Sequence, residues 1–517
     1  MIGRLLLVTA ALAVCITARP DLLFANDDDD NYMHPHLENI ARAGEFRINS
    51  EEYEMEYWNQ QARETIATKN KELNKNVAKN VIMFLGDGMG VTTLKAARVY
   101  MGQLNGEDGE GIQLAMEKLP YSGLSKTYCL DYQVADSACT ATAYLCGVKA
   151  MYGTIGVGGN VRRGDCAANL IESNKASSIA RWSQVAGKRT GIVSTARITH
   201  ASPAGAFAQV ADREWESDYD TSDSSCPDIA YQLIHGETGK NFNVILGGGR
   251  RNFIPNSIYD EENTKGRRRD GLNLIDEWLE SKENENAAYV WNRTGLLEAA
   301  EDSDYLLGLF DSTHMQYYLD ADPELEPTLE EMTEAAIKVL SKSENGYFLF
   351  VEGGKIDHGH HDGLTRKALA ETVEFSKAID KARELTSEED TLIVVTADHS
   401  HVFTVSGYAK RGTDVLSVAG KADDGIAYSI LSYANGPGYR KDVDGDRDDF
   451  STYDTSDKEL LYPAMVPIDS ETHGGEEVGV FASGPWAHLI SGVIEQSVIP
   501  HVMAFASCVG TGATACD

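Results

Sequence analysis

Four short segments of the chain carry the residue types that bind divalent cations. Asp87 lies between two glycines directly after five apolar residues, and residues 352–361 read E-G-G-K-I-D-H-G-H-H. Residues 396–401 read T-A-D-H-S-H, and His473 precedes a pair of glycines. Histidine and carboxylate are the usual zinc ligands, and hard oxygen atoms suit magnesium. Together the segments predict a site for several metal ions, with the following acids and histidines available: Asp87, Glu352, Asp357, His358, His360, His361, Asp398, His399, His401 and His473.

A nucleophile candidate lies in the segment Q-V-A-D-S-A-C-T-A-T-A-Y-L-C-G, where Asp136 and Ser137 begin a run of small, helix-forming residues. The first turn of a helix presents free N–H groups and positive potential, which favour an attacking oxyanion and a bound phosphate. An isolated Asp-Ser pair before a helix usually serves only as an N-cap. Ser137 therefore needs support from other parts of the sequence.

These segments follow short apolar runs that resemble buried strands. The runs cover residues 81–85, 191–194, 244–246, 347–351 and 392–396, with helix-like stretches between them. This alternation is typical of α/β proteins, in which sites form at the carboxyl ends of the strands. From residue 407 to about 465 the sequence becomes rich in Gly, Asp and Tyr, which indicates an inserted subdomain.

The composition is that of a globular, acidic protein. The 517 residues are 42% hydrophobic, enough for one large domain or two ordinary ones. Lys and Arg number 46 and Asp and Glu 80, a net charge of −34, which argues against binding to nucleic acid or to anionic membranes. A small anionic substrate is still compatible with this charge, because bound cations reverse the field locally.

The two ends of the chain predict export. Residues 1–18 have a basic start, a short apolar run and small residues, as in a signal peptide, and residues 19–50 read as a flexible acidic leader or propeptide. No later stretch predicts a membrane span, and the C-terminus lacks the hydrophobic tail of a lipid-anchor signal. We expect a secreted, extracellular protein without a lipid anchor, and Asn292 begins a glycosylation sequon.

Of the eight cysteines, Cys15 lies in the predicted signal peptide. The remaining seven are an odd number, so at least one thiol should stay free in an oxidising compartment. Cys146 lies in an apolar, helix-like run and is expected to be a buried thiol. Cys129 and Cys139 receive no assignment. Two disulfides are predicted: Cys166–Cys226, which would brace a long loop, and Cys508–Cys516, which would close a short one.

Six segments together resemble the animal-type alkaline phosphatases, and they occur in that family's order from about residue 51 to the C-terminus. The resemblance implies an α/β fold, a three-layer α/β/α sandwich around a large, mostly parallel sheet, as one domain over 51–517 with a crown-like insertion at about 407–465. The segments are F-L-G-D-G-M-G, D-S-A-C-T-A-T-A-Y-L-C-G-V-K, T-H-A-S-P-A-G, F-V-E-G-G-K-I-D-H-G-H-H, T-A-D-H-S-H and T-H-G-G-E.

Carried over position by position, the resemblance implies two zinc ions and one magnesium ion per subunit. The implied ligands are Asp357, His361 and His473 for one zinc, Asp87, Ser137, Asp398 and His399 for the other, and Asp87, Ser202 and Glu352 for magnesium. Arg213 would bind two phosphate oxygens with its planar fork, which a lysine would not reproduce. The resemblance also implies positions around the metal ions, without direct ligation or through water, for Asp136, His200, His358 and His401.

The implied activity is the hydrolysis of small phosphate monoesters through a phosphoserine at Ser137, with a broad substrate range and an alkaline optimum. The resemblance further implies a homodimer, with a helix over residues 51–71 and the inserted subdomain at the interface. Two rival interpretations are another enzyme of the same metal-dependent superfamily and a catalytically silent secreted binding protein. Arg213 favours a monoester dianion, and Ser137 does not lie in the C-x-P-x-R pattern of a sulfatase.

Two features depart from the family pattern. Cys139 stands where the family usually has a small residue, two positions after the candidate nucleophile. A calcium site found in many animal members would use Phe310, Asp311 and Glu326, but its remaining acid falls near Ile258, where the local sequence is shifted. The substitutes nearest in sequence are Asp260 and Glu261.

Overall fold

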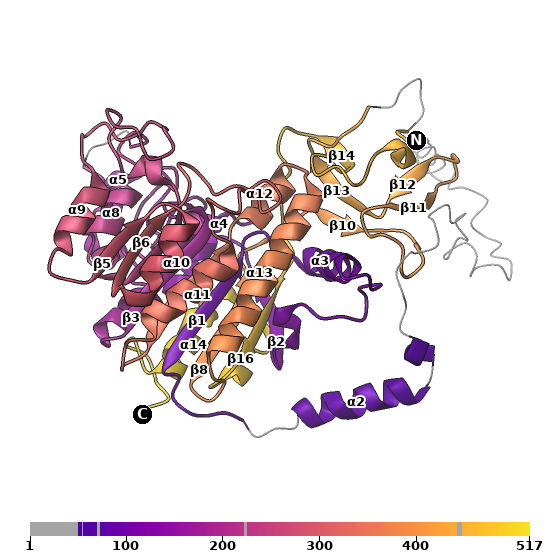
Figure 1. Cartoon of the computed structure of the whole chain (residues 1–517), viewed down its shortest axis with the longest axis horizontal. Coiled ribbons are helices and arrows are strands. Elements are labelled where there is room, and N and C mark those ends of the chain that lie inside the picture. Colours follow the sequence, from indigo (N-terminus) through magenta and orange to yellow (C-terminus); the bar gives the residue numbers. More distant parts are fainter. Residues whose placement is uncertain (1–49, 54, 70–72, 222–224, 442–446, 517) are drawn as a thin grey trace, which may run out of the picture.

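A computed structural model describes residues 50–516, apart from 54, 70–72, 222–224 and 442–446. The predicted signal peptide and almost all of the predicted leader lie outside the described residues. A ten-stranded sheet forms the centre of the molecule, in the order β17-β2-β16-β8-β1-β7-β3-β4-β6-β5 (Figure 1). The strands are β1 (Asn80–Gly86), β2 (Tyr121–Lys126), β3 (Arg189–Arg197), β4 (Val244–Gly248), β5 (Ala287–Val290), β6 (Tyr305–Leu309), β7 (Tyr347–Gly353), β8 (Thr391–Ala397), β16 (Val478–Ser483) and β17 (Gly492–Glu495).

The sheet is mostly parallel. The seven strands from β8 to β5 run parallel to one another, whereas β16 is antiparallel to both of its neighbours, β8 and β2. In β1, Val81, Met83 and Leu85 enter one hydrophobic core, while Ile82 and Phe84 enter a second. Such an unbroken apolar run is typical of a parallel strand covered on both faces. The predicted α/β fold with a large, mostly parallel sheet is confirmed.

Helices cover both faces of the sheet and complete three layers. The first core receives α4 (Ser137–Cys146), α6 (Ile179–Val185), α8 (Ile229–His235), α9 (Leu274–Ser281) and α14 (Ile499–Ser507). The second core receives α3 (Val91–Leu104), α10 (Arg293–Asp302), α11 (Leu329–Leu340) and α13 (Thr365–Leu385). Of these, α10, α11 and α13 cover the face turned toward the viewer in Figure 1.

Short helices lie in the connections. The one-turn and two-turn α-helices are α5 (Cys166–Asn169), α7 (Ala201–Ala204) and α12 (Lys355–His361). The 3₁₀ turns are η2 (Ser50–Tyr53), η3 (Ala115–Lys118), η4 (Glu172–Asn174), η5 (Gly239–Asn241), η6 (Arg250–Asn252), η7 (Phe450–Thr452), η8 (Ala487–Leu489) and η9 (Gln496–Val498).

Small additional sheets lie outside the main one. β10 (Phe403–Val405), β13 (Leu431–Gly436) and β14 (Ala464–Pro467) form a three-stranded sheet, and β11 (Val418–Lys421) pairs with β12 (Ala427–Ser429). These strands fall in or beside the segment 407–465 and lie together at one end of the molecule (Figure 1). A two-stranded ladder joins β9 (Ser400–His401) to β15 (His473–Gly474), which brings two of the metal-binding segments together.

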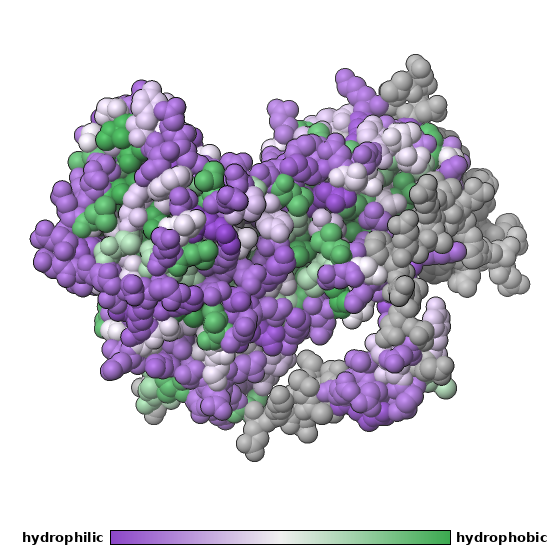
Figure 2. All heavy atoms as spheres, viewed as in Figure 1, coloured by the Kyte–Doolittle hydropathy of each residue, from purple (hydrophilic) through white to green (hydrophobic). Residues whose placement is uncertain are grey.

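The N-terminal helix α2 (Met55–Lys69) lies apart from the main sheet, at the lower right of Figure 1. Its preceding turn is tied to the rest of the chain by an ion pair between Glu52 and Arg411. Among the described helices, none combines the length and the apolar character needed to cross a bilayer. The face seen in Figure 2 is predominantly hydrophilic, in keeping with the net charge of −34.

The structure contains both predicted disulfides, Cys166–Cys226 and Cys508–Cys516. It contains a third, Cys129–Cys139, which the sequence left unassigned. Cys146 is the free cysteine of the described chain and is buried, as predicted. Burial raises the pKa of its thiol to about 12, so it is unreactive in the folded protein.

Candidate metal centre and active site

The carboxyl ends of adjacent parallel strands bring the predicted ligands to one edge of the sheet. In β1, Gly86 lies opposite Gly353 of β7 and Ala397 of β8. The residues that follow, Asp87 after β1 and Asp398 after β8, therefore leave the sheet at the same level. Strand register thus assembles carboxylates that are more than 300 residues apart in the sequence.

Gly88 permits this close approach. It has φ +68°, and a Cβ atom at this position would lie 2.4 Å from His401 Nε2. Its backbone N–H donates to Asp398 Oδ1 at 2.9 Å. A side chain at residue 88 would be strained in its backbone and would collide with the site, so glycine is required here.

A first group of ligand atoms comes from Asp357, His361 and His473. His361 Nε2 lies 3.0 Å from His473 Nε2, and Asp357 Oδ1 lies 3.3 Å from the former and 3.4 Å from the latter. Four ligands placed tetrahedrally at zinc bond lengths of about 2.0–2.1 Å are separated by about 3.3–3.4 Å. The spacing of the three atoms is compatible with one zinc ion.

A second group contains the nucleophile candidate. His399 Nε2 lies 3.1 Å from Asp398 Oδ2 and 3.5 Å from Asp87 Oδ1. Ser137 Oγ lies 3.3 Å from His399 Nε2 and 3.5 Å from Asp87 Oδ1. Asp398 Oδ2 is buried and has no hydrogen-bond partner, as expected of an oxygen that binds a cation. These spacings again fit a zinc ion.

Oxygen atoms make up most of a third group. Ser202 Oγ lies 3.5 Å from Asp87 Oδ2, and Asp87, Glu352 and His200 have ligand atoms close enough to surround one ion. One oxygen of Glu352 accepts from Ser194, and the other, Oε1, is buried without a hydrogen-bond partner. A hard cation such as magnesium suits this donor set.

The buried carboxylates of the site repel one another. Burial, followed by repulsion from Asp398 and Asp357, raises the pKa of Asp87 well above its usual range. Burial raises the pKa of Glu352 to about 8, and Asp398 adds to this effect. Without positive charge at their centre these carboxylates would resist ionisation, and removal of uncompensated charge from water is costly. Cations bound among them would supply the missing charge.

Arg213 pairs with Asp136, the residue before the candidate nucleophile Ser137. Its Nη1 donates to Asp136 Oδ2 at 3.0 Å, and its Nη2 lies 3.1 Å from His200 Nε2. Asp136 caps α4 by accepting from Cys139 N at 3.2 Å, and it also accepts from Gly153 N at 3.1 Å. Ser137 is the first residue of α4, so one capping carboxylate links the helix of the candidate nucleophile to the arginine.

His401 lies between two carboxylates. Its Nε2 is 2.8 Å from Asp357 Oδ1, and its Nδ1 is 2.5 Å from Glu471 Oε2. Burial opposes protonation, but the hydrogen bonds with these two acids raise the pKa of His401 to about 10. Sequence reasoning missed Glu471, although it directly precedes the T-H-G-G segment.

The other histidines divide into two groups. His358 lies near His200, with ring centroids 5.8 Å apart, and near His314, at 4.2 Å. His314 had no sequence signal, because it stands alone in a connecting loop. His360 points away from the centre: Nε2 is 3.0 Å from Thr93 Oγ1 and Nδ1 is 2.9 Å from Tyr433 Oη. The histidine-rich segment thus supplies a ligand candidate, a neighbour of the centre and a core residue.

The residues named for calcium lie apart from this centre. Burial raises the pKa of Glu326 to about 8, with Asp311 as the next cause, and Phe310 is buried. Asp260 and Glu261, the substitutes suggested by the sequence, form ion pairs with the buried guanidinium of Arg250, at 2.9 and 3.5 Å. Both acids thus pair with Arg250 in this structure, and the calcium site stays a prediction.

Asn292, the predicted glycosylation site, is half-buried at the start of α10. Its Oδ1 accepts a hydrogen bond from Gly295 N at 2.8 Å, which caps the helix. The side chain therefore has a structural role whether or not it carries a glycan.

Comparison with known proteins decides the family. Residues 78–509 match the sequence profile described as alkaline phosphatase. The chain belongs to the alkaline phosphatase family. It is 48% identical to a membrane-bound alkaline phosphatase of Bombyx mori over 504 residues, 94% of this chain and 91% of that protein. It is 49% identical to the tissue-nonspecific alkaline phosphatase of Rattus norvegicus over 485 residues, 91% of each chain.

Solved alkaline phosphatases share the fold. The enzyme of Thermus thermophilus has a TM-score of 0.61 at 20% identity, covering 86% of this chain and 96% of that one. The enzyme of the Antarctic bacterium TAB5 has a TM-score of 0.58 at 20% identity, covering 84% of this chain and 100% of that one. The family assignment and the clustered ligands establish a metal-binding phosphatase that hydrolyses phosphate monoesters. A catalytically silent binding protein is thereby set aside.

Proposed function

We propose that this alkaline phosphatase transfers the phosphoryl group of a monoester to Ser137 and then to water, at a centre of two zinc ions and one magnesium ion. The observation that carries the proposal is the position of Ser137 Oγ. It starts helix α4 and lies 3.3 Å from His399 Nε2 and 3.5 Å from Asp87 Oδ1.

The ligand sets follow the three groups of atoms. Asp357, His361 and His473 would hold one zinc, Asp398, His399, Asp87 and Ser137 the other, and Asp87, Ser202 and Glu352 the magnesium. Bound there, the ions would lower the pKa of the attacking and leaving oxygens and neutralise the phosphoryl group.

The protein's own groups bind and align the phosphoryl group. The guanidinium of Arg213 contacts Asp136 and His200 through its two terminal nitrogens, and these contacts fix its orientation. Its remaining N–H groups can then donate to two phosphate oxygens. The first-turn amides of α4 add positive potential at Ser137. Alignment and placed charge of this kind supply most of the catalysis in phosphoryl transfer.

The reaction has two displacements. Ser137 Oγ attacks phosphorus, the bond to the alcohol oxygen breaks, and the alcohol leaves with a proton. Water then attacks the phosphoserine, Ser137 regains its proton, and inorganic phosphate departs. Because the binding groups grip the phosphoryl moiety, we infer a broad range of small monoesters and an alkaline optimum.

We also infer a secreted, glycosylated homodimer. Disulfides indicate an oxidising compartment. Two large apolar side chains on α2 are exposed in the single chain: Met55 is 83% and Trp58 54% exposed. A second subunit would cover them. Sedimentation of the full chain tests this, and a monomer at micromolar concentration would overturn it.

Hydrolysis of a chromogenic phosphate monoester tests the proposed chemistry. Ser137→Ala should abolish turnover. Metal content, measured by mass spectrometry, should stay near that of the wild type for magnesium and for the zinc that Ser137 does not bind. Ser122→Ala, an exposed serine on β2, is the matched control and should be fully active. Undiminished turnover in Ser137→Ala would exclude the phosphoserine route. A phosphate diester and a sulfate ester, assayed in parallel, should be poor substrates.

A further inference from the structure

A disulfide lies against the residue that orients the phosphate-binding arginine. Cys129 follows β2, and Cys139 lies in the first turn of α4, two residues after Ser137. Their disulfide closes a loop of ten residues that contains both Asp136 and Ser137. Both cysteines are almost fully buried, at 2% and 1% exposure.

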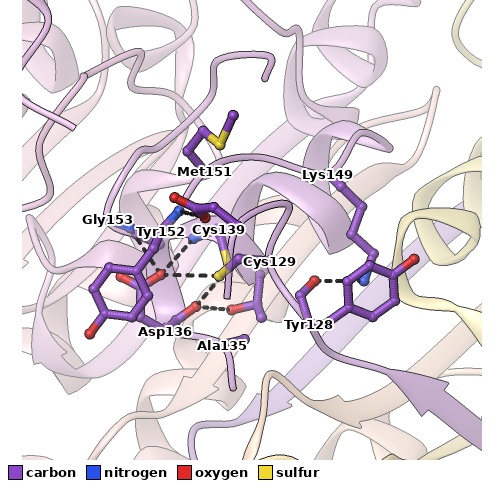
Figure 3. The surroundings of a disulfide bond; sticks show 12 residues. Tyr128, Cys129, Ala135, Asp136, Cys139, Lys149, Met151, Tyr152 and Gly153 are labelled. Carbon is purple, nitrogen blue, oxygen red and sulfur yellow. Dashed lines mark hydrogen bonds between the residues drawn. A yellow bond between two sulfur atoms is a disulfide. The ribbon is translucent and has the colours of Figure 1, made fainter. Parts of the chain in front are cut away.

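The two cross-linked residues contact the carboxylate of Asp136 through one sulfur atom and one backbone amide. Cys129 Sγ lies 3.8 Å from Asp136 Oδ1, and Cys139 N donates to the same oxygen at 3.2 Å (Figure 3). Gly153 N donates to it at 3.1 Å, which leaves Oδ2 for Arg213. The carboxylate is thus fixed on one side by the cross-linked turn and on the other by the arginine.

Noncovalent packing of this loop is slight. The local hydrophobic cluster has four small buried residues, Cys129, Ala135, Cys139 and Ala150, and is separate from both main cores. The half-buried ring of Tyr152 packs against it and lies 4.6 Å from the ring of Tyr132. Within the loop, Leu130 and Tyr132 are 49% and 56% exposed. Little apolar area is buried, so hydrophobic packing contributes little to holding the loop in place. The covalent bond is the strongest link between the loop and α4.

We propose that the Cys129–Cys139 disulfide is a positioning element for phosphate binding, which holds the Asp136 carboxylate where it orients Arg213. The proposal rests on the proposed role of Arg213. The disulfide would touch neither substrate nor metal. Its effect would be to keep the arginine's free N–H groups directed at the phosphoryl group, because a misplacement of about 1 Å at such a group is enough to impair catalysis severely.

The other disulfides offer a matched control. Cys508–Cys516 closes a loop of similar length, eight residues apart in sequence, beyond the C-terminal helix α14. Cys129→Ala with Cys139→Ala removes the proposed positioning element, and Cys508→Ala with Cys516→Ala removes a cross-link of similar size elsewhere. Both variants are prepared with zinc and magnesium, and their metal content is measured.

The decisive readout is competitive inhibition by inorganic phosphate, compared with kcat and with the thermal midpoint. The Cys129/Cys139 variant should raise the inhibition constant for phosphate about tenfold with metals intact. The Cys508/Cys516 variant should leave it within twofold of the wild type. In an Asp136→Ala background the Cys129/Cys139 change should add nothing, because both changes act on the same contact.

Each alternative result is distinguishable. An unchanged inhibition constant in the Cys129/Cys139 variant, or full additivity with Asp136→Ala, overturns the positioning role. If Arg213→Lys itself leaves phosphate inhibition unchanged, the proposed role of Arg213 fails instead. If the double alanine variant does not fold, partial reduction of the native enzyme gives the same comparison, with the opened disulfide located by peptide mapping. Weaker phosphate inhibition only in protein with an open Cys129–Cys139 disulfide supports the proposal. Equal inhibition overturns it.

Discussion

Arg213→Lys isolates the geometry of the phosphate clamp from its charge. Arg213 holds Asp136 through Nη1 and His200 through Nη2, at 3.0 and 3.1 Å, and these contacts fix the plane of the guanidinium. Lysine retains the positive charge but has no planar fork, so it cannot hold Asp136 and donate to two phosphate oxygens at once.

The expected loss corresponds to about one charge-assisted hydrogen bond in the transition state. Such a bond contributes about 2–3 kcal/mol, which is roughly a 30- to 160-fold fall in kcat/KM. The assay is steady-state hydrolysis of a chromogenic monoester by enzyme of verified metal content. Arg293→Lys, whose arginine pairs with Glu331 between α10 and α11, is the control and should match the wild type. An Arg213→Lys enzyme within threefold of the wild type would contradict the clamp.

Three further predictions concern metal removal, pH and thiol reactivity. Chelation should abolish activity and lower the thermal midpoint, because Asp87, Glu352 and Asp398 are then buried together without compensating charge. An ion at 1,000 times its Kd contributes about 4 kcal/mol to stability. Full stability of the chelated protein in calorimetry would contradict this. Glu371→Gln should stabilise the protein above pH 7 and not near pH 4. Burial raises the pKa of Glu371 to about 7, so the folded state binds a proton that the unfolded state releases. The stability of the wild type therefore falls as pH rises from about 4.5 to 7, by at most about 3 kcal/mol. Urea unfolding of both proteins at the two pH values measures the difference, and an equal gain at both would refute this cause. Cys146, buried with its thiol pKa raised to about 12 by burial, should resist alkylation in native protein and react after unfolding, as peptide mapping can show; rapid native labelling would mean that helix α4 opens.

The sequence predicted those parts of the fold and site that depend on local patterns. Unbroken apolar runs such as β1 predicted parallel strands, and the acids and histidines that follow them predicted a site at the strand ends. Asp87, Asp398 and Ser137 do come together, because strand register and the start of α4 place them at one edge. The individual ligand roles come from the family resemblance and stay predictions.

Other features could not be predicted because they depend on long-range packing. His314 and Glu471 contact the centre's histidines only after distant segments meet. His314 belongs to no motif, and Glu471 lies just before the T-H-G-G segment without being part of it. His360 lies in the richest ligand segment but turns into the core toward Tyr433, since adjacent helical residues face different directions. Cys129 and Cys139 were left without a partner because cysteine spacing alone does not determine connectivity.

Trapping of the covalent intermediate tests the central claim most directly. The enzyme, with zinc and magnesium bound, is mixed with a monoester substrate, quenched in acid within one turnover and digested for mass spectrometry. We predict one phosphoryl group on Ser137 in the wild type, none in Ser137→Ala, and none on the control residue Ser122. Rapid hydrolysis without phosphorylation of Ser137, or with the phosphoryl group on another residue, would contradict the account.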